Sequence, residues 1–151
     1  MLLPLPVAKV RALSLENHLA LAAIRGGHGS EGAAMNLLRV VYLAWFIRDA
    51  AEGDRYAGVF REAETTLARS RARAQQGQGW TLPEGDHEVL ADILALHDQQ
   101  LASAPSHRYT AAWERLDRFL RNDDLVSPLP GAPDGGPSLG RPPYGDELFC
   151  Q

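Results

Sequence analysis

The stretch from Met35 to Ile47 (MNLLRVVYLAWFI) constrains the fold most, because it is apolar on nearly every side. No glycine or proline interrupts the chain between Ala33 and Glu52. The Val40-Val41-Tyr42 run by itself would favour a buried strand, but an uninterrupted pattern of this length predicts a helix. A helix with so little polar surface must be enclosed by other elements. We therefore predict that it is the central element of an all-α bundle.

Four further segments carry apolar residues at helical spacing, so we expect about five helices in a compact bundle. The first segment follows Pro6 and ends at Gly26-Gly27, where glycine allows the left-handed stop of a helix. Ser30 is expected to cap the central helix. The remaining helices are expected to begin at side-chain caps, namely Asp54, the Thr81–Glu84 capping box and Ser106, with Asp86 as a rival cap for the fourth helix one turn after the box.

Each outer helix should turn one apolar stripe to the core and its charged residues to water. In the first helix the predicted stripe is Val7, Val10, Leu13, Leu21 and Ile24, with Lys9, Arg11, Glu16 and Asn17 facing outward. In the third it is Tyr56, Val59, Phe60, Ala63 and Leu67, with Glu64 on the opposite face. The fourth and fifth stripes run from Val89 to Leu101 and from Tyr109 to Leu120.

The composition changes after Asn122, and this predicts two regions: a bundle domain over residues 1–122 and a flexible tail over residues 123–151. The tail contains six prolines and five glycines, so we expect it to be disordered. It also holds five acidic residues and one base, whereas residues 1–122 hold 14 of each sign. The net charge of −4 therefore lies in the tail, which we interpret as a tether or, through Leu148-Phe149, a peptide ligand.

The cellular compartment is predicted from features of the two ends and of the apolar runs. The N-terminus lacks the charged region and long apolar stretch of a signal peptide, and no apolar run is long enough to span a bilayer. Cys150 is the single cysteine, so no disulfide forms within the chain. We expect a cytoplasmic protein with no membrane partner.

Two histidines raise the alternative of a metal-binding or enzymatic bundle. His18 and His97 are expected to face inward or to lie at the edge of their apolar stripes, with Asp98 nearby, and bundle interiors build metal sites from inward side chains of this kind. However, neither His-x-x-Glu nor His-Glu-x-x-His occurs, so we interpret both as packed, hydrogen-bonded residues and expect no metal or cofactor. No G-x-S-x-G motif is present and Cys150 lacks a fixed base, so we expect no catalytic activity.

Three arginines raise a second alternative, a transcription-associated protein that binds DNA. Arg69, Arg71 and Arg73 follow one another near the end of the third predicted helix. Their alternate spacing distributes them around the helix, and a neutral body does not offer the basic face that nucleic acid binding normally needs. We therefore do not expect nucleic acid as the partner.

Asn17-His18 in the first helix and Leu96-His97-Asp98-x-x-Leu101 in the fourth resemble a family of small all-helical proteobacterial proteins, sometimes labelled Fis-family regulators. The resemblance covers about residues 10–120. It implies an all-helical protein from a GC-rich proteobacterium, carried on a mobile element. The regulator label does not transfer, because the chain lacks a basic helix-turn-helix at its C-terminal end. Our leading hypothesis is a regulatory or interaction module whose partner is another protein or a second copy of itself.

Overall fold

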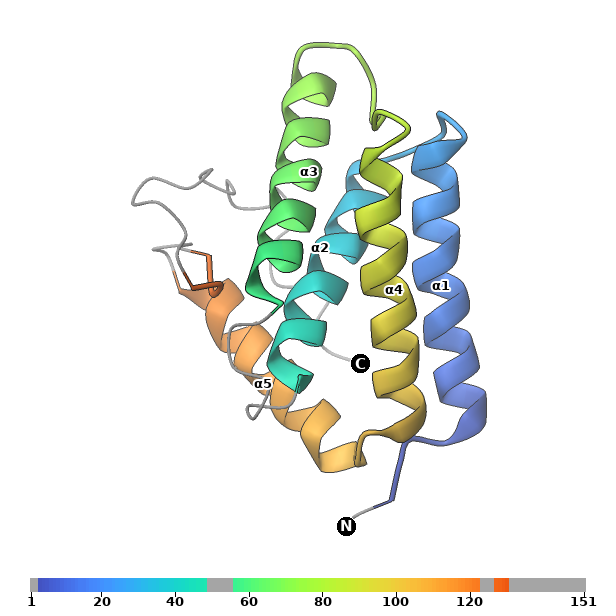
Figure 1. Cartoon of the computed structure of the whole chain (residues 1–151), viewed down its shortest axis with the longest axis vertical. Helices are drawn as coiled ribbons and strands as arrows, with labels where there is room; N and C mark the ends of the chain where they lie inside the picture. Colours follow the sequence, from blue (N-terminus) through green and yellow to red (C-terminus); the bar gives the residue numbers. More distant parts are fainter. Residues whose placement is uncertain (1–2, 49–55, 123–126, 131–151) are drawn as a thin grey trace.

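The computed structural model describes residues 3–48, 56–122 and 127–130 of the chain. Its described part folds into five α-helices packed as one bundle (Figure 1): α1 Val7–Arg25, α2 Glu31–Ile47, α3 Ala57–Gln75, α4 Asp86–Ser103 and α5 Ser106–Arg121. Within these residues the only β-type pairing is an isolated antiparallel bridge between Pro4 and Pro105. The predicted all-α fold is confirmed.

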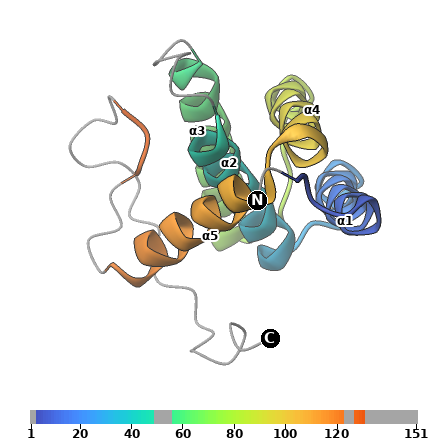
Figure 2. The same ribbon diagram turned by 90° about the horizontal axis from the view of Figure 1, so that it is seen from below.

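Helix α2 is the centre of the bundle, as its apolar sequence predicted. It packs against α1, α3, α4 and α5, and Figure 2 shows the other helices arranged around it. Ten of its 17 residues are buried, more than in any other helix. Because burying one large apolar side chain stabilises a fold by about 1.5–3 kcal/mol, this helix contributes the largest share of the core.

Helix α1 lies at one edge of the bundle (Figures 1 and 2). Its main contacts are with α2 and α4, so only one side of the helix is covered. The segment before it is tied to the turn between α4 and α5, where the Ser106 N–H donates to the Leu3 carbonyl at 2.8 Å. This edge position becomes important for function below.

Two helix ends have the geometry that the sequence predicted. The Ser30 hydroxyl accepts a hydrogen bond from the Ala33 N–H at 3.1 Å and caps α2. At the end of α1, Gly27 takes a φ of 77° and the His28 N–H donates to the Ala23 carbonyl at 2.8 Å. This is the Schellman arrangement, which satisfies carbonyl groups that the helix leaves unpaired.

Two predicted caps are wrong, because tertiary contacts use the groups involved. Helix α4 begins at Asp86 and not at the Thr81–Glu84 capping box. Leu82 is buried and the Thr81 carbonyl accepts from Arg73 at 3.3 Å, so this segment is held outside the helix. Ser106 is the first residue of α5 and not its side-chain cap. Asp54 lies outside the described residues.

Two predicted core stripes are partly wrong. In α1, Val7 is exposed and Asn17 is buried, where its side-chain oxygen accepts from the Asn36 amide at 3.1 Å. In α3, Phe60, Ala63 and Leu67 are buried as predicted, but Tyr56 and Val59 are exposed and Glu64 is buried. The stripes of α4 and α5 are buried or half-buried throughout. Polar partners inside the bundle, described below, explain the buried Asn17 and Glu64.

The tight approach of Gly29 to Trp80 generates a prediction about stability. A Cβ atom at Gly29 would lie 2.6 Å from the Trp80 carbonyl oxygen and 2.9 Å from Cγ1 of Ile24. We expect Gly29→Ala to lower the free energy of unfolding by about 1–3 kcal/mol, since backbone must move to admit the methyl group. Urea denaturation measures this change.

The matched control is Gly32→Ala, in the first turn of α2. There the nearest atom to a new Cβ is the Ser30 hydroxyl oxygen at 3.7 Å, so the methyl group fits. We expect this variant to be as stable as the parent, or more stable by about 0.5 kcal/mol, because alanine favours helix over glycine. Equal losses in the two variants would contradict the packing argument.

Candidate functional site

His97 lies inside the bundle, as predicted, and links α4 to α2. Its side chain is 2% exposed, and its Nδ1 lies 3.1 Å from Oε1 of Gln100. The Gln100 amide nitrogen in turn donates to the Ala44 carbonyl at 2.9 Å. Because that donor faces Ala44, the Gln100 oxygen faces the ring, and Nδ1 of His97 must carry the proton. Burial lowers the pKa of His97, so the ring is neutral at pH 7 in the folded protein.

His18 does not face inward, so of its two predicted orientations the structure excludes the inward one. Its side chain is half-exposed, and its Nε2 lies 2.7 Å from a carboxylate oxygen of Asp98 on α4. His97 follows the buried stripe of α4, whereas Asp98 lies one residue farther around that helix, where it can reach the surface of α1. The His18–Asp98 pair therefore joins two helices at the surface and does not continue the His97 chain.

The histidines do not assemble a metal site in the described part of the chain. Over residues 3–48, 56–122 and 127–130, no three His, Cys, Asp or Glu side chains lie close enough together to hold a metal ion. His87 is also buried, and its Nδ1 has no hydrogen-bond partner among the residues that the structure describes. The contacts of His18 and His97 are those of packed, hydrogen-bonded side chains.

A buried carboxylate links α2, α3 and the segment after α5. The Tyr42 hydroxyl donates to Glu64 at 2.5 Å, and the Ser127 hydroxyl donates to the same oxygen at 2.7 Å. Tyr42 also packs edge-on against Phe119 of α5, with ring centres 5.3 Å apart. Burial, together with the Glu64 carboxylate, raises the pKa of Tyr42 far above its usual value, so the phenol stays neutral and donates.

The sequence placed residues 127–130 in the tail, but in the structure they pack against the bundle. Leu129 is buried, and the Arg61 guanidinium donates to the Pro130 carbonyl at 2.6 Å. A single leucine among prolines has no periodicity, so no pattern in the sequence indicated this contact. The other predicted tail residues lie outside the described ranges.

The three arginines of the DNA-binding alternative have three different environments. Arg69 is exposed, Arg73 donates to the Thr81 carbonyl, and Arg71 lines a small cavity with Trp80. A two-residue step turns a helix by about 200°, so consecutive members of this series cannot share a face. They do not form one basic surface.

A pocket of about 220 Å³ lies where the ends of α2, α3, α4 and α5 meet. Two cations line it, but both are engaged within the bundle. Arg108 donates to the Ile47 carbonyl at 3.1 Å, and the Arg48 guanidinium lies 3.4 Å from the centre of the Trp45 ring. Cations beside the last carbonyls of a helix stabilise its C-terminus. We therefore interpret the pocket lining as support for α2.

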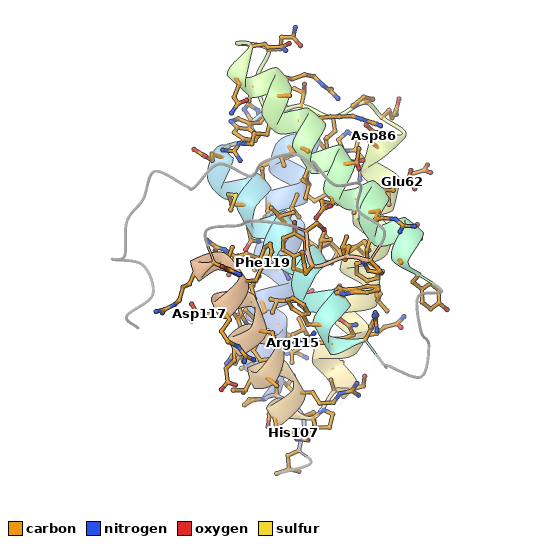
Figure 3. The ribbon with its side chains drawn as sticks, turned by 90° about the vertical axis from the view of Figure 1, so that its left-hand side faces the viewer. Glu62, Asp86, His107, Arg115, Asp117 and Phe119 are labelled. Carbon is orange, nitrogen blue, oxygen red and sulfur yellow. The ribbon has the colours of Figure 1, made fainter. Side chains whose placement is uncertain are left out.

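Figure 3 shows the side chains on the side of the molecule that α5 covers. Arg115 and Phe119 lie along the part of α5 that faces α2. The Arg115 guanidinium lies 4.5 Å from the centre of the Phe46 ring and screens it from water. Trp45 and Phe60 are buried against each other with ring centres 5.3 Å apart. The aromatic rings of α2 and their partners on α3 and α5 are therefore in contact with other side chains of the bundle.

An apolar surface with no partner in the described part of the chain lies on α1. Along the middle of the side that faces away from α2 and α4, every residue is apolar and exposed. We call this set of residues the outer face of α1; it consists of Ala8, Ala12, Leu15, Leu19 and Ala22. Leu15 is 61% and Leu19 58% exposed. Val7, the first residue of α1, and Leu3, which precedes the helix, are exposed as well. This outer face is the candidate functional site.

Sequence reasoning missed the outer face because it looked for one apolar stripe per helix. Helix α1 has two, and the more strongly apolar one, with Leu21 and Ile24, faces the core. The sequence did contain a signal for the outer face. From Ala8 to Ala22 its apolar residues recur at alternate intervals of four and three positions, which places them on the side of the helix opposite the core stripe.

Comparisons with protein-family models, with curated proteins and with solved structures found no match to this chain. Among the helices that the structure describes, none has the length and apolar character required to cross a membrane.

The hydrogen bond from Tyr42 to Glu64 predicts how much stability the protein loses when the Tyr42 hydroxyl is removed. We expect Tyr42→Phe to lower the free energy of unfolding by about 1–3 kcal/mol, because the buried Glu64 carboxylate loses one of its two hydrogen bonds. In a Glu64→Met background the same substitution should cost little, since no carboxylate remains to be satisfied. Urea denaturation of the parent, the two single variants and the double variant gives the coupling free energy between Tyr42 and Glu64. Equal costs of Tyr42→Phe in both backgrounds would contradict the prediction.

The buried His97 ring predicts how stability depends on pH. Its pKa is below 6.5 in the folded protein, so the unfolded chain binds the proton more readily. The contribution of the neutral His97 ring to the free energy of unfolding is therefore fully present above about pH 6.5, and it is lost as the pH falls through the pKa of the folded protein. His97→Asn keeps an N–H donor towards Gln100 but does not titrate. Urea titrations from pH 7.5 to 5 should show a smaller loss for this variant, and parallel curves would contradict the prediction.

Proposed function

We propose that this protein is a helical interaction module without catalytic activity, which binds another protein molecule through the outer face of α1. The observation that carries the proposal is the exposure of Leu15 and Leu19 in the middle of a regular helix. Contiguous exposed apolar surface marks interaction sites in folded proteins, whereas single exposed apolar residues need no explanation.

The exposed apolar residues of the described chain concentrate at α1. Four of its six exposed large hydrophobic side chains are Leu3, Val7, Leu15 and Leu19, and the other two, Tyr56 and Val59, lie at the start of α3. Burying a leucine stabilises a structure by about 1.5–3 kcal/mol relative to leaving it in water. A partner that covers both leucines of the outer face therefore gains a large part of the free energy of binding from them.

A helix face is also the surface that an α-helical partner recognises. Apolar residues separated by four and three positions lie in one row and fit between the side chains of a facing helix. The outer face of α1 has this row, and the helix is held rigidly from behind by the core contacts of Leu21 and Ile24. The binding surface is thus formed before the partner arrives.

Site-specific crosslinking in cells tests the proposal. A photo-reactive benzophenone amino acid replaces Leu19 on the outer face or, as the matched control, the exposed Val59 on α3. We expect a discrete higher-mass adduct from position 19 and not from position 59, and Leu15→Glu should abolish it, because a charge in the row opposes desolvation. The proposal fails if position 19 gives no adduct, or if both positions give the same adducts.

A further inference from the structure

We propose that the molecule bound by the outer face of α1 is a second copy of this chain, and that the two α1 helices pack side by side in parallel. This inference rests on the proposed function and names its partner. It is argued from the spacing of the outer face, from the charges beside it and from the position of α1 in the bundle.

The outer face has the repeat of a coiled-coil seam. Its residues follow one another at intervals of four, three, four and three positions, as the a and d positions of successive heptads do. In a parallel pair each residue of the row packs against its own counterpart. Leu15 and Leu19 then form two central layers, and the alanines on either side let the two helices approach closely.

The charged residues Arg11 and Glu16 flank the middle of this row on opposite sides. With Ala12 and Leu19 at a positions, Arg11 occupies a g position and Glu16 an e position, and both are exposed. In a parallel pair a g residue faces the e residue five positions later on the other helix. Arg11 therefore faces the partner's Glu16, and Glu16 faces the partner's Arg11.

The same charges disfavour the antiparallel arrangement. Antiparallel helices bring e against e and g against g, which sets Glu16 opposite the partner's Glu16 and Arg11 opposite the partner's Arg25. Like charges at these positions oppose association. Among the described residues the salt bridges are His18–Asp98 and Asp117–Arg121, so neither Arg11 nor Glu16 forms one with another described residue.

The position of α1 allows this pair to close. Helices α2 and α4 cover the opposite side of α1, so each bundle lies behind its own α1 helix and away from the seam (Figure 2). A two-fold axis parallel to α1 relates the copies, and the contact uses the same surface on both. No further copy can add to it, so the assembly is a dimer.

Charge reversal with rescue tests the pairing. Sedimentation equilibrium of the full-length protein gives the dimer dissociation constant of the parent, Arg11→Glu, Glu16→Arg and the variant with both changes. Each single reversal turns two attractive contacts into two repulsive ones, so we expect each to weaken the dimer about tenfold or more. The double reversal restores both pairs and should return the constant to within about threefold of the parent. Single reversals without effect, or a double reversal as weak as the singles, would overturn the proposal.

Cysteine crosslinking tests the direction. In a Cys150→Ser background, Ala8→Cys and Ala22→Cys are each oxidised. A parallel pair brings each new thiol next to its counterpart, so both variants form disulfide dimers. An antiparallel pair with Glu16 opposite Glu16 separates like positions by about 15 Å or more, which is too far for a disulfide, and forms neither. Circular dichroism confirms that every variant stays helical. Absence of both disulfides in a dimeric protein overturns the parallel arrangement.

Failure of this inference is distinguishable from failure of the proposed function. If the purified protein is monomeric while position 19 crosslinks to a different protein in cells, the outer face binds another chain and the second-copy proposal is overturned. If the protein is monomeric and position 19 gives no adduct, both proposals are overturned.

Discussion

The enclosure of α2 is the constraint on which the rest of the structure depends. A helix that is apolar around its whole circumference needs neighbours on every side, and α1, α3, α4 and α5 supply them. The capped start at Ser30 and the Arg108 contact to the Ile47 carbonyl fix its two ends. The other helices thus take their places by covering α2, and the positions of their remaining faces follow from that packing.

Polar groups inside the bundle determine how the helices are oriented around α2. Glu64 is buried because Tyr42 and Ser127 donate to it, and His97 is buried because Gln100 connects it to the Ala44 carbonyl. An unsatisfied buried polar group costs more than one that is paired, so each link favours a single rotation and register of its helix.

The proposed function arises from what this packing leaves uncovered. Helix α1 covers one side of α2 and contacts α4, which uses one of its two apolar sides. The second side, centred on Leu15 and Leu19, has no partner in the described chain, and Arg11 and Glu16 flank it with opposite charges. An apolar row with complementary charges on its two margins has the chemistry of a helix–helix interface, and it suits an identical helix in the same direction.

The sequence by itself determined the all-α class, the central role of α2, the Ser30 cap, the glycine stop after Arg25 and the inward position of His97. These features depend on local periodicity and on backbone geometry, which neighbouring residues specify. Only the tertiary structure decided that Asn17 and Glu64 are buried, that Val7 and His18 are exposed, and that Leu129 packs on the bundle. The physical reason is that each of these depends on a partner distant in the chain: Asn36, Tyr42 and Asp98 provide the polar contacts, and packing against α2 and α4 selects which of the two apolar sides of α1 meets the core.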